Sequence, residues 1–268
     1  MNLIDQTFER LRAEGRTALI PFITVGDPDI PTSVELIREL EAAGADIVEL
    51  GVPYSDPLAD GPVIQRASER ALRNRISILD CIQAAEDARA AGVKLPFILF
   101  TYYNPVLQLG LDRFFRLVGD KGISGLIIPD LPIEEDAEVR TLAEAAGIHL
   151  IPLVAPTSEE RINRIVSKAR GFVYCVSSLG VTGVRNDFHA GIEEFLRAVK
   201  TASPVPVAIG FGISSREQVE RFAREVDGVV VGSAIVRTIE DALPELMDAG
   251  RRGDGLGKVR SFVETLRT

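Results

Sequence analysis

The chain has 268 residues, of which 46% are hydrophobic and 26% are charged, a balance that is typical of a soluble globular protein. Its net charge of −9 argues against a nucleic-acid-binding protein. Two cysteines and two histidines exclude a disulfide framework and a four-cysteine zinc site, so we expect catalysis to depend on carboxylates, hydroxyls or backbone groups, without a bound metal.

Residues 1–16 are predicted to form a charged amphipathic helix. This segment lacks the apolar core of a signal peptide. No apolar run along the chain reaches the roughly 18 residues that a membrane span requires. Because the two cysteines are also expected to be reduced, the sequence predicts a cytoplasmic location.

Short apolar runs then alternate with amphipathic patterns. Eight runs rich in Val, Ile and Leu are predicted to be strands, at residues 18–24, 46–50, 97–101, 126–128, 150–154, 172–176, 207–209 and 228–231. Helical patterns lie between them at residues 31–43, 63–74, 78–91, 133–146, 158–169 and 214–224. The second interval is about twice as long as the others and contains two of these helices.

Eight strand–helix units without a linker predict a single α/β domain over residues 1–268. We expect a (β/α)8 TIM barrel with an extra N-terminal helix and an extra helix after the second strand. The apolar runs lack clean alternation, as expected for parallel strands that are buried on both faces. The alternative is a doubly wound open sheet, but no G-x-G-x-x-G motif follows the first strand, which weakens its dinucleotide-binding version.

Two carboxylates fall where a barrel of this type places its active site, at the C-terminal ends of the strands. Glu49 ends the second strand among apolar residues, and burial there would raise its pKa toward the range of a general acid or base. The alternative is a structural Glu paired with Arg or Lys. Asp60 lies in a proline-rich loop just before the next helix, where it could either cap that helix or complete a two-carboxylate site.

Glycine-bearing segments follow strands six, seven and eight, at residues 180–183, 210–214 and 232–235. Such segments let backbone N–H groups approach an anion, and a helix N-terminus adds a favourable dipole. The Gly232-Ser233 pair fits the phosphate site that barrels build near strands seven and eight. The alternative is that these glycines only form tight turns.

Other polar and aromatic residues near the strand ends have simpler interpretations. Asp130 could cap a helix that begins at Ile133, and Phe22 could belong to the core or to a pocket floor. Tyr102, Tyr103 and Asn104 follow the third strand, where an exposed aromatic pair would suit a substrate wall or a partner surface.

Several segments together resemble the tryptophan synthase α-subunit family, and the similarity runs nearly from end to end. They are Phe22 with residues 26–28, then residues 49–62, 101–105, 129–132, 180–183, 210–214 and 232–236. The fourteen residues from Glu49 to Pro62 are far more specific than any glycine motif.

The resemblance implies a carbon–carbon lyase that cleaves indole-3-glycerol phosphate, by a retro-aldol reaction, to indole and glyceraldehyde 3-phosphate. It also implies that this chain needs no cofactor or metal. The indole would pass to a β subunit, which uses pyridoxal phosphate to make tryptophan, within an allosteric αββα complex.

The same resemblance assigns roles to individual residues. Glu49 would be the acid/base at indole C3 and at the adjacent hydroxyl, Asp60 would bind the ring N–H, and Tyr174 would assist. The implied phosphate cradle is Gly183, Gly212, Gly232 and Ser233, and the implied indole pocket is Phe22, Phe100, Tyr102, Ile127, Thr182 and Phe211. Asp56, Asn104, Pro105 and Asp130 resemble the surface that meets the β subunit, and the loop around Thr182, with Arg185 beyond it, resembles a lid.

Two other functions remain as alternatives at this point. One is a different phosphate-binding barrel enzyme, such as an isomerase or cyclase, which would share the Gly-Ser site but not residues 49–62. The other is a non-catalytic barrel that only activates a β subunit, but loss of Glu49 or Asp60 would then be expected, and both are present.

Overall fold

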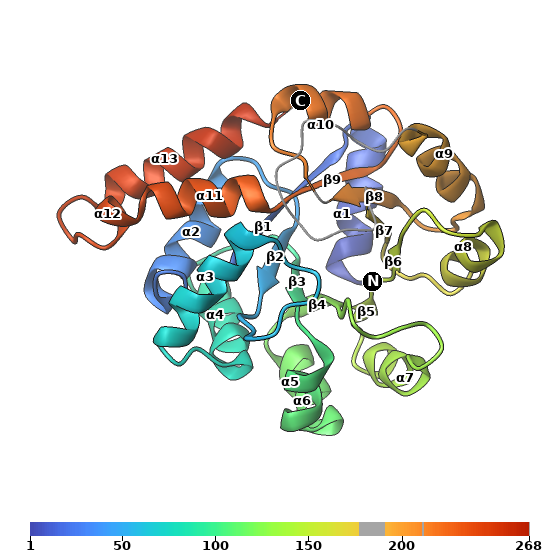
Figure 1. The fold of residues 1–268 in the computed structure, drawn as a ribbon, viewed down its shortest axis with the longest axis horizontal. Helices are drawn as coiled ribbons and strands as arrows, with labels where there is room; N and C mark the ends of the chain where they lie inside the picture. Colours follow the sequence, from blue (N-terminus) through green and yellow to red (C-terminus); the bar gives the residue numbers. More distant parts are fainter. Residues whose placement is uncertain (177–190, 211, 268) are drawn as a thin grey trace.

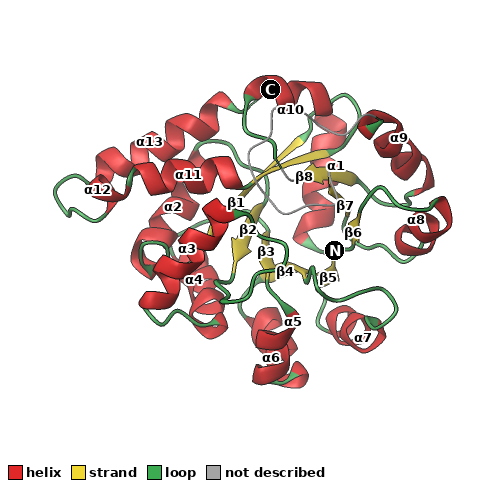
Figure 2. Cartoon of the chain, viewed as in Figure 1, coloured by secondary structure: helices red, strands yellow, loops and turns green. Residues whose placement is uncertain are grey.

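The computed structural model describes residues 1–176, 191–210 and 212–267. Within them, nine parallel strands lie in the centre of the molecule and the helices surround them (Figures 1 and 2). The strands are β1 (Ala18–Thr24), β2 (Val48–Gly51), β3 (Phe97–Phe100), β4 (Ile123–Ile127), β5 (His149–Leu150), β6 (Leu153–Val154), β7 (Val173–Val176), β8 (Val207–Gly210) and β9 (Gly228–Val231).

The sheet forms a barrel because a single chain segment joins its two ends. The strand order is β5-β4-β3-β2-β1-β9-β8-β7-β6, and β5 and β6 are separated by only Ile151 and Pro152. The Ile151 N–H donates to the Leu126 carbonyl, and the Tyr174 N–H donates to the Pro152 carbonyl. Segment 149–154 therefore pairs with β4 on one side and with β7 on the other. The expected single strand at residues 150–154 is interrupted because Pro152 has no N–H to donate.

The helices are α1 (Leu3–Glu14), α2 (Ile30–Ala42), α3 (Pro62–Arg73), α4 (Ile78–Ala90), α5 (Tyr103–Leu109), α6 (Leu111–Asp120), α7 (Ala137–Ala145), α8 (Glu159–Val166), α9 (Ile192–Ala202), α10 (Arg216–Phe222), α11 (Ser233–Asp241), α12 (Leu243–Leu246) and α13 (Arg252–Thr265). Helix α1 precedes the barrel, and α3 and α4 both lie between β2 and β3. The predicted α/β barrel class is confirmed.

The helix expected at residues 133–146 begins later than predicted, at Ala137. Residues 132–135 form a turn instead, in which the Glu135 N–H donates to the Pro132 carbonyl. The Asp136 carboxylate pairs with Arg140 rather than capping the helix through its own side chain. Because no helix starts at Ile133, the predicted role of Asp130 as its cap is wrong.

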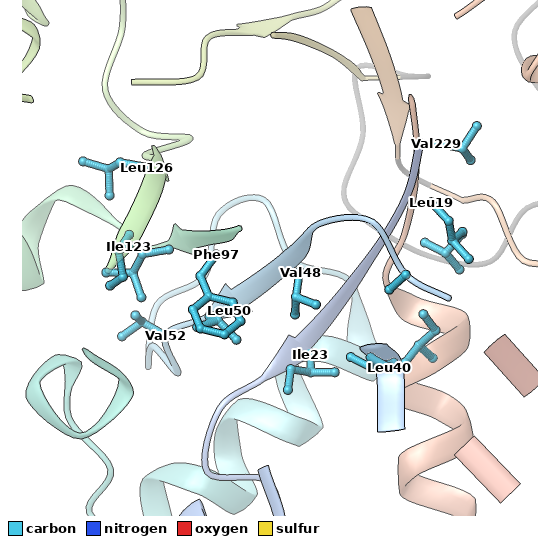
Figure 3. Close-up of a cluster of buried hydrophobic side chains, with 14 of the residues drawn as sticks. Leu19, Ile23, Leu40, Val48, Leu50, Val52, Phe97, Ile123, Leu126 and Val229 are labelled. Carbon is cyan, nitrogen blue, oxygen red and sulfur yellow. The ribbon is translucent and has the colours of Figure 1, made fainter. Parts of the chain in front are cut away.

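Along most strands, alternate residues belong to two different hydrophobic cores, as the two-residue period of a strand requires. Side chains that point outward, such as Leu19, Val48 and Phe97, pack under the helices in the cluster that Figure 3 shows. Side chains that point inward, such as Ile20 and Ile98, fill the barrel interior. Both faces are apolar, which explains why the sequence shows no clean alternation.

Helix α1 closes the N-terminal end of the barrel. The Asn2 side chain donates to the carbonyls of Ser124, at the start of β4, and of Gly147, just before β5, at 2.8 and 2.9 Å. Phe8 enters the interior cluster, where its ring lies 5.5 Å from that of Phe172. The opposite, C-terminal end of the barrel is left for a binding site.

Across the described part of the chain, every helix is too short or too polar to cross a membrane.

We predict that Phe8→Ala lowers the free energy of unfolding by about 3–5 kcal/mol, because it leaves a cavity between α1 and Phe172. Denaturant unfolding followed by circular dichroism would measure the loss. Leu3→Ala, on the same helix at a side chain that is 39% exposed, should cost far less. Equal losses in the two variants would contradict the role of Phe8 in closing the barrel.

Candidate active site

A pocket at the C-terminal end of the barrel collects side chains and turns from six parts of the chain. It is lined by Phe22, Glu49, Asp60, Ile64, Phe100, Tyr174, Gly212, Val230, Gly232 and Ser233. Eight of these were singled out from the sequence. Ile64 and Val230 were not, because an apolar residue on a helix or a strand carries no local signal that distinguishes a pocket wall from the core.

Strand register places Glu49 inside the barrel. Glu49 pairs with Phe22 on one neighbouring strand and with Ile98 on the other, while its sequence neighbours Val48 and Leu50 point outward. Its side chain is only 1% exposed, and its Oε1 atom has no hydrogen-bond partner in the described part of the chain. Burial raises the pKa of Glu49 to about 8.

The structural alternative for Glu49 required a partner of opposite charge. Among residues 1–176, 191–210 and 212–267, no Lys or Arg forms an ion pair with Glu49. An unpaired carboxyl in an apolar interior is stable only while it carries its proton. The geometry therefore favours a proton donor over a structural ion pair.

Asp60 faces the same pocket from the loop that precedes α3. Its Oδ2 accepts a hydrogen bond from the Tyr102 hydroxyl at 3.1 Å, and burial raises its pKa to about 6, although this hydrogen bond opposes the rise. The expected alternative, that Asp60 caps the helix, is wrong. The N-cap residue of α3 is Gly61 and not Asp60, and the Asp60 carboxylate is bonded to Tyr102.

Tyr102 fixes the loop that carries Asp60. Its hydroxyl oxygen accepts from the Ala59 N–H at 3.0 Å while it donates to Asp60, and its ring stacks on Tyr54 at 4.9 Å. Burial raises the Tyr102 pKa above its ordinary value. Tyr102 thus fixes the position of Asp60 without itself lining the pocket.

The predicted aromatic wall is only partly formed by pocket-lining residues. Phe22 and Phe100 line the pocket and meet edge to face, with ring centres 5.7 Å apart. Ile127 pairs with Phe100 at the end of β4 but is fully buried in the interior cluster. Thr182, Gly183, Arg185 and Phe211 lie outside the described residues.

Tyr174 reaches the pocket from β7 and depends on a glycine of the next strand. A Cβ atom at Gly210 would overlap the Tyr174 hydroxyl. Burial, and the nearby charge of Glu49, raise the Tyr174 pKa well above its ordinary value. Gly210 therefore makes room for an aromatic ring, a role that a glycine-rich turn in the sequence does not reveal.

Gly212 and Gly232, two of the three glycines predicted to bind phosphate, line the pocket. Gly232 and Ser233 begin α11, so the unpaired N–H groups of its first turn face this end of the barrel. Gly212 has φ of +99°, a conformation that side chains other than glycine rarely adopt. Together they offer an anion two sets of backbone donors.

The four residues predicted to contact a β subunit lie in the loops that follow β2 and β4 and on helix α5 after β3, at this end of the barrel. The Asp130 carboxylate accepts from the N–H of Tyr103, the first residue of α5, at 2.9 Å, and thereby caps the helix that contains Asn104 and Pro105. The loop that carries Asp56 is tied to the start of α5 by the Tyr102 hydroxyl.

Two exposed leucines lie beside these residues and were not predicted, one in the loop before α3 and one on α5. Leu58 is 76% exposed and Leu107 is 48% exposed. We call Asp56, Leu58, Asn104, Pro105, Leu107 and Asp130 the partner surface.

Within the described residues, no group of three or more His, Cys, Asp or Glu side chains could hold a metal ion.

Replacing the buried carboxyl should make stability less sensitive to pH. Unfolded Glu49 ionises above about pH 4.5, whereas the folded residue keeps its proton to about pH 8, so native stability falls as pH rises through this window. Across this whole pH window the free energy of unfolding falls by up to about 5 kcal/mol. We therefore expect Glu49→Gln to gain stability relative to the parent chain between pH 4 and pH 8.5 in urea unfolding.

A matched control is Glu160→Gln, which removes an exposed carboxyl from α8. It should change stability little at either pH. If the difference between Glu49→Gln and the parent chain were the same at pH 4 and pH 8.5, the assigned pKa of Glu49 would be wrong.

Comparison with known proteins agrees with this arrangement. Residues 8–255 match the family model described as tryptophan synthase alpha chain. The tryptophan synthase alpha chain of Bacillus pumilus is 52% identical over 252 residues, which cover 94% of each chain. That of Bacillus subtilis strain 168 is 53% identical over 244 residues, which cover 91% of each chain.

Solved structures give the same result. A tryptophan synthase alpha chain from Legionella pneumophila superposes with a TM-score of 0.88 at 36% identity, covering all of this chain and 96% of that chain. A Mycobacterium tuberculosis tryptophan synthase structure gives 0.86 at 39% identity, covering 98% and 96%. On this evidence, and with its two buried carboxyls at the mouth of a parallel barrel, the chain belongs to the tryptophan synthase alpha chain family.

Proposed function

We propose that Glu49 and Asp60 carry out the carbon–carbon cleavage of this lyase family, in which indole-3-glycerol phosphate gives indole and glyceraldehyde 3-phosphate. The observation that carries the proposal is the pair itself. Two carboxyls face one pocket, and burial raises the pKa of Glu49 to about 8 but that of Asp60 only to about 6. At neutral pH one is mainly an acid and the other mainly an anion, which gives them different roles.

Glu49 supplies the proton that makes the indole a leaving group. Indole leaves poorly as a C3 carbanion, so the protonated Glu49 carboxyl donates to C3 and gives an indolenine cation. The bond from C3 to the glycerol chain then breaks, its electrons neutralise the cation, and the adjacent hydroxyl becomes an aldehyde. The Glu49 carboxylate accepts the hydroxyl proton and is ready for another turnover.

Asp60 stabilises the positive charge that develops on the ring. Its ionised carboxylate accepts a hydrogen bond from the indole N–H, and this interaction strengthens as the ring becomes cationic. The Tyr102 hydroxyl and the Ala59 N–H hold the loop in place, so little reorganisation is needed when the charge appears. Tyr174, beside Glu49, has the accessory role.

The remaining pocket residues bind the two ends of the substrate. Phe22 and Phe100 would contact the indole, with Ile127 and Tyr102 behind them and Thr182 and Phe211 as further wall residues. Gly212, Gly232, Ser233 and Gly183 would hold the phosphate through N–H and hydroxyl groups. The first turn of α11 supports this assignment, because a helix N-terminus attracts an anion even in a chain of net charge −9.

The partner in this proposal is a tryptophan synthase β subunit, joined through the partner surface in an αββα complex. Its exposed leucines, among polar groups held by Asp130 and Tyr102, support a protein contact. Residues 1–268 act as one barrel domain in the cytoplasm. The cleavage uses no cofactor in this chain, and pyridoxal phosphate belongs to the β subunit.

We expect Glu49→Gln to lower kcat for indole release by about 10²–10⁴-fold, because an amide cannot donate the proton. Indole would be measured with purified chain, alone and mixed with a β subunit. Binding of glyceraldehyde 3-phosphate, compared with the parent chain, serves as the control for an intact site. Near-normal turnover in the complex would remove Glu49 from the acid/base role.

Asp60→Asn should lower kcat by about 10²–10³-fold, since the neutral amide loses the charge that stabilises the cation. The parent chain should also lose kcat below about pH 6, where Asp60 becomes protonated, and Asp60→Asn should lose that dependence. Steady-state kinetics between pH 5 and pH 8 would test both effects. An unchanged kcat in a folded variant excludes Asp60 from the mechanism.

A further inference from the structure

Four charged side chains outside the pocket form a continuous network between α3, α11 and the loop after β1. Arg70 on α3 makes a two-point contact with Asp27, at 2.8 and 2.9 Å, and also donates to Glu240 at 2.8 Å. Arg66, one turn earlier, makes a two-point contact with Glu240 at 2.8 and 2.7 Å. We call Asp27, Arg66, Arg70 and Glu240 the ion-pair network.

The arginine–carboxylate contacts of the ion-pair network fix the relative positions of the side chains that they join. Paired N–H···O bonds from a guanidinium to a carboxylate define both distance and direction. Asp27 is 2% exposed and Arg70 is 21% exposed, so this end of the network is largely shielded from water. The two arginines lower the pKa of Glu240 to about 2, so Glu240 stays charged throughout the working pH range.

Each helix of the network begins at the pocket. Helix α3 follows Asp60 directly, and the Gln65 side chain in its first turns donates to the Asp60 carbonyl at 2.7 Å. Helix α11 begins at Ser233, and Glu240 lies near its other end. The two helices pack side by side (Figure 1). The network therefore joins α3, whose preceding loop carries Asp60, to α11, which begins at the phosphate turn.

A further contact joins the C-terminal end of α3 to the loop after β1. The Asn74 side chain, at the C-terminal end of α3, donates to the Pro28 carbonyl of the loop after β1 at 2.6 Å. Helix α3 is thus fixed along its length, by Gln65 near the start, the two arginines in the middle and Asn74 at the end. The remaining charged groups nearby are Arg237, 3.9 Å from Glu240, and Glu69 on α3.

We propose that Arg70 and Glu240 are positioning residues that hold the Asp60 carboxylate at a fixed place relative to the phosphate turn at Ser233. Neither side chain lines the pocket, so each acts through the helix that it anchors. The inference rests on the proposed function, in which Asp60 stabilises the cation while Ser233 binds the phosphate of the same substrate. Small displacements between two such groups reduce the rate, because the substrate must engage both at once.

The test is a double-mutant cycle with Asp60. Glu240→Gln keeps the shape of the side chain and removes the charge that both arginines share. We expect it to lower kcat for indole release by five- to twentyfold while KM changes less than threefold. In the Asp60→Asn background the same substitution should lower kcat by less than twofold, because there is no carboxylate charge left to position.

Arg70→Lys separates geometry from charge, since lysine keeps the charge but not the planar fork. It should lower kcat at least threefold and should not restore parent activity. Glu264→Gln removes a carboxylate from Arg260 on α13, away from the pocket, and serves as the matched control with unchanged kinetics. Circular dichroism would confirm that each variant is folded.

If Glu240→Gln fails to fold, Arg66→Gln replaces it in the test, at a side chain that is 43% exposed. We expect Arg66→Gln to lower kcat two- to fivefold, with the same dependence on Asp60.

The outcomes separate the two proposals. If the parent chain releases no indole, or Asp60→Asn does not reduce kcat, the proposed function fails, and this inference fails with it. If both hold but Glu240→Gln reduces kcat by the same factor in the two backgrounds, the network has only a structural role. A folded Glu240→Gln with kcat within twofold of the parent chain also overturns the inference.

Discussion

The chemistry of this barrel depends on one electrostatic constraint, the burial of the Glu49 carboxyl with no Lys or Arg ion-paired to it among the described residues. Period-two alternation turns residue 49 into the interior, where the neighbouring side chains are apolar. Removing a carboxylate from water without a partner is costly, so the group keeps its proton to about pH 8. Native stability therefore falls as pH rises from about 4.5 to about 8, and in return the strand end holds a carboxyl that is still mainly protonated at neutral pH.

The second carboxyl shows how a small difference in surroundings changes a role. Asp60 is also buried, but it accepts a hydrogen bond from Tyr102, which favours its ionised form. Its pKa of about 6 leaves it mostly ionised at neutral pH. Two similar side chains in one pocket are therefore divided between proton transfer and charge stabilisation, and no metal or further titratable group is needed in the proposed mechanism.

Rigidity around the pocket comes from contacts that lie outside it. The Tyr102 hydroxyl fixes the loop of Asp60, Gly210 leaves space for Tyr174, and the ion-pair network ties α3 to α11. Asp130 caps α5 and so orders the partner surface beside the same loop. The proposed partner contact and the proposed catalytic aspartate are thus connected through Tyr102 and its neighbour Tyr103.

The sequence by itself determined the barrel, six of its strands closely, and the two carboxyls, and its family resemblance added most of the pocket. These follow from local properties, namely the spacing of apolar residues, the turns that end them and the run from Glu49 to Pro62. Only the tertiary structure decided that Glu49 has no Lys or Arg ion pair within the described residues, that Asp60 accepts from Tyr102 instead of capping α3, and that Asp130 caps α5. Each of these depends on a residue from another strand or loop, and periodicity along one segment carries no information about such contacts.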